Sequence, residues 1–248
     1  RPEIDRWIIS LLNSLVKEVG NCYEDYDLTR AGRAIQEFVT ENLSNWYVRL
    51  NRKRYWGGEF DNDKLCAYQT LFTCLETVSR LAAPIAPFFM DQLFRDLNKA
   101  TVRNNEDSVH LAVFPESDDD LIDRDLEERM DIAQKISSMI LGLRRKVSIK
   151  VRQPLARIMV PVTEKSFRDK FESVKDLILA EVNVRDVVYI DDTSAIVVRK
   201  VKPDFRTLGP RYGKMMKDIS KAVSDLSRKE ITDFESSGSH KLVIDGNE

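Results

Sequence analysis

The chain has 248 residues, of which 42% are hydrophobic and 32% are charged, and its formal net charge is −2. This composition is typical of a globular protein with one large domain or two to three small ones, and no apolar run approaches the roughly 20 residues that a membrane helix needs. Its three cysteines and two histidines form no paired-ligand spacing, so we expect no structural zinc site, and the odd cysteine count is typical of a reducing cytosol.

The first two expected helices are amphipathic. Apolar residues recur at helical spacing over residues 3–19, and no N-cap precedes them, which suggests a chain cut from something longer. Gly20-Asn21 is expected to end this helix. Asp27 is a good N-cap for a second helix over residues 28–55, which Gly57-Gly58 should stop.

Two further helices complete a predicted bundle. A third helix is expected over residues 61–83, and a short, strongly apolar fourth helix follows the break that Pro84 and Pro87 impose. Four helices with short loops predict an antiparallel bundle over residues 1–115. The residues expected to face inward on the third helix are Leu65, Tyr68, Phe72, Leu75, Val78 and Leu81, and the apolar residues of the fourth helix are Phe88, Phe89, Leu93, Phe94 and Leu97.

The pattern changes after residue 115. Residues 116–202 predict a helix followed by a small α/β unit, and residues 203–248 predict a C-terminal junction segment. The expected elements are helices at 123–147, 166–180 and 215–226, β-branched segments at 149–162, 186–190, 195–201 and 241–244, and a loop at 208–214. The fold class is therefore mainly α, an antiparallel helical bundle followed by a small mixed α/β junction region.

The charges of this second half are segregated. Residues 116–131 hold nine acids and two bases, residues 132–163 hold seven bases and no acid, and residues 199–217 hold seven bases and one acid. Any one run can be a solvated helix face, but three basic zones beside an acidic one favour an oriented polyanionic partner.

The segment LSNWYVRLNRKRYW, residues 43–56, carries four cations, four aromatic residues and no acid. Cations attract phosphates and aromatic faces stack on bases, which is the pairing that binding of single-stranded RNA requires. Trp46 falls on the apolar face of the second expected helix and is expected to pack in the core. Tyr55 and Trp56, at the end of that helix, are expected to be exposed. The candidate RNA contacts here are Asn42, Asn45, Arg49, Arg52, Lys53, Arg54, Tyr55 and Trp56.

A second candidate set lies in the basic zone downstream. Its side chains either follow an RNA backbone or face the acidic segment just upstream. The set consists of Arg144, Arg145, Lys146, Lys150 and Arg152.

Catalysis needs several reactive side chains in a recognisable pattern, and the sequence contains no such pattern. The chain has no GxxxxGK[ST] or GxGxxG phosphate loop and no GxSxG elbow, and its two histidines have no ligand set around them. We therefore expect no catalytic residue, no metal ligand and no cofactor in this chain.

Seven segments in sequence order resemble the region after the catalytic core of class I aminoacyl-tRNA synthetases of the isoleucine, valine and leucine group. NWYVR with its basic tail, and IKVRQPL, favour the isoleucyl branch. Val113 departs from the pattern, which has an acid there. The segments are IDRWIIS (4–10), YDLTRAGRAIQEF (26–38), LSNWYVRLNRKRYW (43–56), AYQTL (67–71), LAAPIAPF (81–88), VHLAVFP (109–115) and IKVRQPL (149–155).

The resemblance implies a helical anticodon-binding domain that binds isoleucine tRNA through its anticodon stem-loop. It also implies a cytoplasmic, monomeric enzyme in which ATP, magnesium, and the catalytic and editing domains lie outside this chain. Two alternatives stay open. One is the same module from a valyl- or leucyl-type synthetase, and the other is a helical protein-interaction scaffold with an incidental basic surface.

Overall fold

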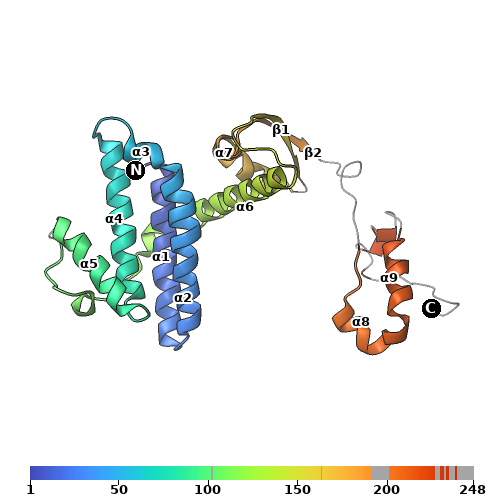
Figure 1. Cartoon of the computed structure of the whole chain (residues 1–248), viewed down its shortest axis with the longest axis horizontal. Coiled ribbons are helices and arrows are strands. Elements are labelled where there is room, and N and C mark those ends of the chain that lie inside the picture. The colour runs from blue at the N-terminus through green and yellow to red at the C-terminus, as the bar shows by residue number, and fades with distance from the viewer. Residues whose placement is uncertain are drawn as a thin grey trace. The chain divides into compact units, whose positions relative to one another are not determined.

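The computed structural model describes residues 1–101, 103–162, 164–190, 201–226, 230, 231, 233, 234 and 238. The chain divides into two compact units, one of residues 1–158 and 164–186 and the other of residues 159–163 and 187–248 (Figure 1). The strands predicted at 195–201 and 241–244 lie, apart from Val201, outside the described residues.

The first two helices form an antiparallel pair (Figure 1). Helix α1 spans Glu3–Glu24, and α2 spans Leu28–Glu37. The prediction that Gly20-Asn21 ends α1 is wrong, because Cys22, the next residue, is also buried and the helix continues past it to Glu24. Asp27 caps α2 as predicted, since its Oδ1 accepts a hydrogen bond from the Arg30 amide at 2.9 Å.

The long second helix predicted to reach residue 55 is divided into three parts. Beyond α2 the chain forms a π-helix, η1, over Phe38–Val48, and then the short helix α3 over Arg52–Trp56. The wider turn of a π-helix changes which neighbouring side chains face the same way, and here both Trp46 and Tyr47 are buried. The packing role predicted for Trp46 is therefore confirmed.

Helices α4 and α5 complete the bundle. Helix α4 spans Asn62–Ala82, and Asp61 caps it by accepting from the Lys64 amide at 2.8 Å; α5 spans Pro87–Thr101. The prediction of which α4 residues face inward is only partly right. The buried residues of α4 are mainly small ones, which let helices approach closely, while bulkier residues lie at the edge of the interface. Those buried on α4 are Ala67, Thr70, Cys74, Val78, Ser79, Leu81 and Ala82.

The apolar start of α5 is only partly buried. Phe94 is buried against Ala83 and Val109, but Phe88 and Phe89 are exposed. Helix α5 packs on α4 along one face only, so residues in its first turn that lie off this face reach solvent.

The remaining elements of the first unit lead from the bundle into the α/β part. They are the 3₁₀ turns η2 (Val109–Leu111) and η3 (Asp119–Leu121), helices α6 (Arg124–Lys146) and α7 (Lys165–Val182), and strands β1 (Leu155–Pro161) and β2 (Val184–Ile190), whose last residues belong to the second unit. The Leu155 amide donates to the Asn183 carbonyl and the Val162 amide to the Ile190 carbonyl, so β1 and β2 are parallel and α7 is their crossover. The predicted mainly helical fold with a small α/β part is confirmed.

The described part of the second unit also contains two helices and a short turn. They are α8 (Phe205–Tyr212), η5 (Gly213–Met215) and α9 (Met216–Ser224). The loop predicted at 208–214 is therefore wrong, because α8 accommodates Pro210. Among all described residues, no helix combines the length and apolar character needed to cross a membrane.

Candidate nucleic-acid interface

The basic segment of residues 43–56 reaches the surface on α3. Arg52 and Lys53 are exposed, and the Trp56 side chain is 73% exposed. The Arg52 guanidinium lies 5.6 Å from the centroid of the Trp56 ring, within the range of a cation–π contact. These side chains line an open groove of about 1000 Å³. The arrangement offers a flat aromatic surface with positive charge beside it.

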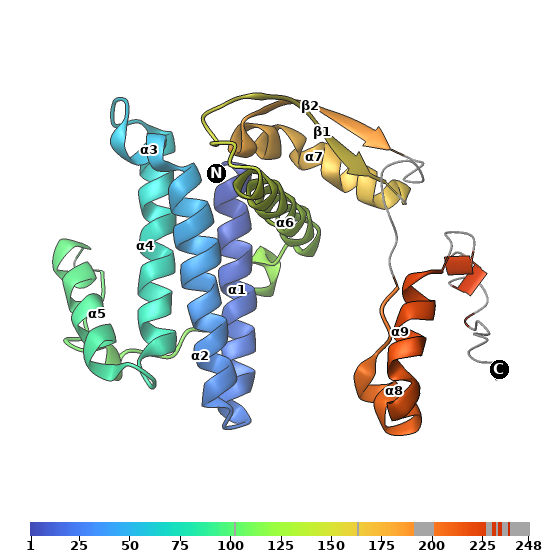
Figure 2. The same ribbon diagram turned by 45° about the vertical axis from the view of Figure 1, so that its right-hand side comes forward.

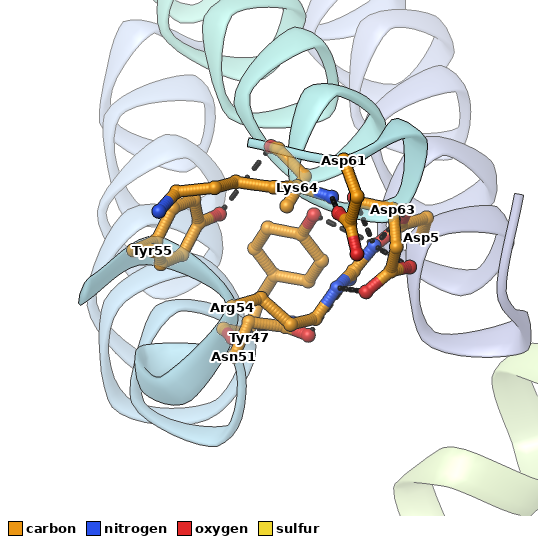
Figure 3. Close-up of polar contacts among 9 residues, drawn as sticks. Asp5, Tyr47, Asn51, Arg54, Tyr55, Asp61, Asp63 and Lys64 are labelled. Atoms are coloured by element: carbon orange, nitrogen blue, oxygen red, sulfur yellow. Dashed lines mark hydrogen bonds and ion pairs between the residues drawn. The ribbon is translucent and has the colours of Figure 1, made fainter. Parts of the chain in front are cut away.

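Arg54, in the same helix, points the opposite way, into the bundle (Figure 3). Its guanidinium donates to Asp5 of α1 at 2.7 and 3.0 Å and to the Asp63 carboxylate of α4 at 2.7 and 2.8 Å. The Asp5 carboxylate is fully buried and also accepts from the Tyr47 hydroxyl at 2.8 Å. These hydrogen bonds, those to Asp5 foremost, raise the pKa of Arg54. Arg54 therefore ties α3 to two helices, and its donors are occupied inside the fold.

Tyr55 is buried, so the prediction that it is exposed is wrong. Its hydroxyl donates to the Ala67 carbonyl at 3.4 Å, and its ring meets Trp56 and Tyr68 edge-to-face with centroids 6.0 and 5.3 Å apart. Tyr55 thus supports the Trp56 ring from within the bundle.

The burial of Tyr55 predicts a loss of stability at alkaline pH. Burial raises the pKa of Tyr55 from 10.0 to about 12. Between these values the unfolded chain releases the phenolic proton more readily than the folded one, so stability falls as pH rises through this window, by at most about 2–3 kcal/mol. Burial also raises the pKa of Tyr47 and the Cys74 thiol, and both groups remain in Tyr55→Phe, so wild type is compared with this variant.

Urea unfolding at pH 8 and pH 11 measures this difference. Tyr55→Phe should lose less stability over the interval than the wild type. Equal losses in both proteins would contradict the assignment.

The turn after α3 requires glycine at two positions. A Cβ atom at Gly57 would lie 2.8 Å from the Lys53 carbonyl oxygen, which already accepts from the Gly57 amide. Gly58 has φ +70°, where side chains are strained. This turn ends α3 directly after Trp56 and so fixes the position of the indole.

Two other predicted contacts link η1 to α6 and α7. Arg49 forms an ion pair with Glu181 of α7, and its guanidinium lies 5.9 Å from the Trp46 ring centroid. The Asn42 amide oxygen accepts from Gln134 of α6 at 3.1 Å. Asn45, by contrast, has an exposed side chain. Asn45 thus lies at the surface with Arg49, whose side chain is 49% exposed but paired, while Asn42 is half-buried and bonded to α6.

The second predicted set also divides. Arg144 is buried and donates at 2.8–3.1 Å to four backbone carbonyls, those of residues 150, 153, 182 and 183. Arg144 therefore connects the end of α6 to the loop that follows it and to the end of α7. The other members are exposed, and none pairs with an acid among the described residues; they are Arg145, Lys146, Lys150 and Arg152.

The acidic segment upstream has other partners. Asp119 pairs with Lys17, Glu128 with Lys170, and Asp131 with Lys135. The alternative that this segment neutralises the second basic set therefore finds no support in the described ion pairs. The described residues also contain no group of three or more His, Cys, Asp or Glu that could hold a metal ion.

Known proteins resemble this chain over its whole length. Residues 5–160 match the family model described as the anticodon-binding domain of tRNA ligase. Over all 248 residues the chain is 56% identical to the isoleucine–tRNA ligase of Bacteroides thetaiotaomicron and 54% identical to that of Bacteroides fragilis, and it covers 21% and 22% of these relatives. It is 40% identical over 246 residues to the isoleucine–tRNA ligase of Clostridium acetobutylicum, 23% of which is covered. The chain thus spans about a fifth of the length of the curated relatives that it matches.

Proposed function

Because the chain belongs to the family of anticodon-binding domains of tRNA ligases, we propose that it binds isoleucine tRNA through the anticodon stem-loop. The observation that carries this proposal is the exposed Trp56 ring, placed beside Arg52 on a short cationic helix that is fixed to the bundle. An unstacked base finds an aromatic face there, and its phosphate finds a positive charge.

The proposed contact residues are fewer than the sequence alone predicts. Arg52, Lys53, Trp56 and Asn45 form the first group, which binds unstacked bases and their phosphates. The exposed cations Arg145, Lys146, Lys150 and Arg152 form the second group, which follows the RNA backbone. The buried or paired members of the predicted set hold these groups in place; they are Asn42, Arg49, Arg54, Tyr55 and Arg144.

The same proposal places the chain within a larger isoleucine–tRNA ligase. Catalysis and editing, with the ATP and magnesium that ligation uses, belong to other parts of that enzyme, which we propose to be cytoplasmic and monomeric. Within the chain, residues 1–115 would act as the anticodon-binding bundle, 116–202 as the helix with its α/β unit, and 203–248 as the junction segment.

Trp56→Ala tests the proposal. Stacking of one base is worth roughly 1–3 kcal/mol, so affinity for isoleucine tRNA should fall about 5- to 150-fold in a gel-shift titration. Phe88→Ala removes an aromatic residue that is even more exposed than Trp56 and lies outside the proposed interface, so it is the control. Unchanged affinity in Trp56→Ala, or an equal loss in both variants, would remove the RNA role from α3.

A further inference from the structure

The groove beside Trp56 contains an acid that the RNA contacts proposed above do not use. Glu59 lies in the turn between α3 and α4, three residues after Trp56, and both residues line the open groove of about 1000 Å³ (Figures 1 and 2 show this turn at one end of the bundle). Glu59 is exposed and forms no ion pair among the residues that the structure describes. A carboxylate repels RNA phosphates, so in this groove Glu59 is suited to contact a base and not the backbone.

The other two acids that line the groove have partners within the fold. The Asp61 carboxylate accepts from the Lys64 amide at 2.8 Å and caps α4. The Asp63 carboxylate pairs with Arg54 at 2.7 Å, and Figure 3 shows both acids beside the polar contacts that hold α3. Of the described acids in the groove, Glu59 is therefore the one whose carboxylate is left available to a ligand.

The turn that carries Glu59 is fixed at both ends. At its start, the Gly57 carbonyl accepts from the Lys64 ammonium at 3.2 Å. At its end, the Asp61 amide donates to the Glu59 carbonyl at 3.1 Å. The carboxylate is thus attached to backbone of defined conformation, as is the Trp56 ring one residue before the turn. The two side chains can therefore act on one ligand.

The chemistry of a carboxylate decides which base fits. An ionised carboxylate only accepts hydrogen bonds, so it selects a ligand with N–H donors. Guanine has two neighbouring donors, N1–H and an N2 amine hydrogen, on its Watson–Crick edge, and the two carboxylate oxygens accept both at once. Adenine and cytosine have one amine beside an acceptor nitrogen, and uracil has a single N–H between two carbonyls. Guanine is thus the best match for an aromatic face with a carboxylate beside it.

We infer that this groove binds an unpaired guanine of the anticodon loop, with the guanine ring stacked on Trp56 and its Watson–Crick edge bonded to Glu59. The inference rests on the proposed function, because it requires that RNA binds at α3. Arg52 and Lys53 line the same groove and neutralise the neighbouring phosphates. In this arrangement the aromatic ring and the cations supply affinity, and Glu59 supplies base specificity.

Glu59→Gln tests the assignment, because the two possible roles of the acid predict changes of opposite sign. If Glu59 bonds guanine, affinity for isoleucine tRNA should fall roughly 5- to 20-fold in a gel-shift titration, since an amide presents a donor where the carboxylate presented an acceptor. If Glu59 is only an acid near phosphates, its neutralisation should raise affinity. Affinity that stays equal or rises would overturn the inference.

Glu24→Gln is the matched control for this change. Glu24 is an exposed acid at the end of α1, and it pairs with no cation among the described residues. Its neutralisation should not lower affinity for tRNA. A loss as large as that in Glu59→Gln would show that the effect does not belong to the groove, and the inference would fall.

A change in the RNA identifies the base. Inosine lacks the N2 amine of guanine but keeps N1–H and the purine ring, so each guanine of a synthetic isoleucine anticodon stem-loop is replaced by inosine in turn. At one loop position the replacement should weaken binding by the wild-type chain roughly 5-fold or more and leave binding by Glu59→Gln unchanged. Equal losses in the two proteins, or no loss at any loop guanine, would contradict the pairing.

Kethoxal gives a readout that does not depend on affinity, because it modifies N1 and N2 of unpaired guanine. At protein concentrations that saturate the tRNA, the wild-type chain should protect one guanine of the anticodon loop from kethoxal. Glu59→Gln should leave that guanine reactive. A guanine that both proteins protect equally would overturn the role of Glu59.

The inference and the proposed function fail in different ways. The Glu59 and Trp56 variants should keep thermal midpoints close to that of wild type, because both side chains are exposed. A chain that loses affinity with Trp56→Ala but not with Glu59→Gln binds RNA at α3 without reading guanine there, and only the inference falls. If neither variant lowers affinity, RNA does not bind at α3 and both fall.

Discussion

Arg54→Met is expected to lower the free energy of unfolding by about 3–5 kcal/mol. The substitution keeps most of the side-chain volume but leaves the Asp5 carboxylate fully buried, with the Tyr47 hydroxyl as its remaining side-chain donor. A buried carboxylate without its cation is far more costly than a lost surface ion pair. Urea denaturation of wild type and variant, followed by circular dichroism, measures the difference.

Asp63→Asn is the matched control. Asp63 contacts the same guanidinium, but its side chain is 48% exposed, so we expect a loss of at most about 1 kcal/mol. Adding Asp5→Asn to Arg54→Met should restore part of the lost stability, because it removes the unpaired buried charge. A loss in Arg54→Met no larger than that in Asp63→Asn would show that the Asp5–Arg54 pair does not hold α3.

Arg52→Glu with Lys53→Glu is expected to weaken isoleucine tRNA binding roughly 10- to 100-fold at moderate salt. Both side chains are exposed, so folding should be unaffected. If each cation contacts one phosphate of a single strand, the log–log slope of affinity against salt should become shallower by about 1.4. Gel-shift titrations at several salt concentrations measure both quantities.

Arg33→Glu with Arg103→Glu makes the same change in net charge away from α3, at two exposed cations that pair with no acid among the described residues, and is the control. It should reduce affinity much less and leave the salt slope nearly unchanged. Equal effects of the two double variants would mean that only net charge matters. Arg49 is not suitable for this test, because a glutamate there would face the largely buried Glu181 and disturb the contact with α7.

The sequence predicts local features of this fold well. Asp27 is a cap whose partner lies three residues away, so the rule that identifies it needs no tertiary information. The end of α1 is different. Gly20 is a reasonable stop signal, but burial of Cys22 two residues further on favours continuing the helix to a turn closed by Tyr26.

The candidate site is less predictable, because the roles of its cations depend on distant partners. Arg52, Lys53 and Arg54 are adjacent and chemically alike in the sequence. Only the fold shows that Arg54 meets Asp5, 49 residues away, while its neighbours face solvent. Arg144 is similar, since two of its acceptors lie 38 and 39 residues further along the chain.

The family resemblance has the same limit. Several of its matched residues, such as Trp7, Trp46 and Tyr47, are buried and form the core of the bundle. Motifs made of core residues identify the fold well, but they say little about which residues contact RNA. The exposed Tyr26 and Phe88 fall within matched segments too, but nothing in the sequence pattern distinguishes them from core positions.

Nucleotide-resolution footprinting of isoleucine tRNA with the isolated chain tests the anticodon-binding role most directly. We predict protection of the anticodon loop by the wild-type chain, and loss of that protection with Arg52→Glu and Lys53→Glu. A tRNA that stays equally reactive throughout, or that is protected only in its acceptor arm, would contradict this role.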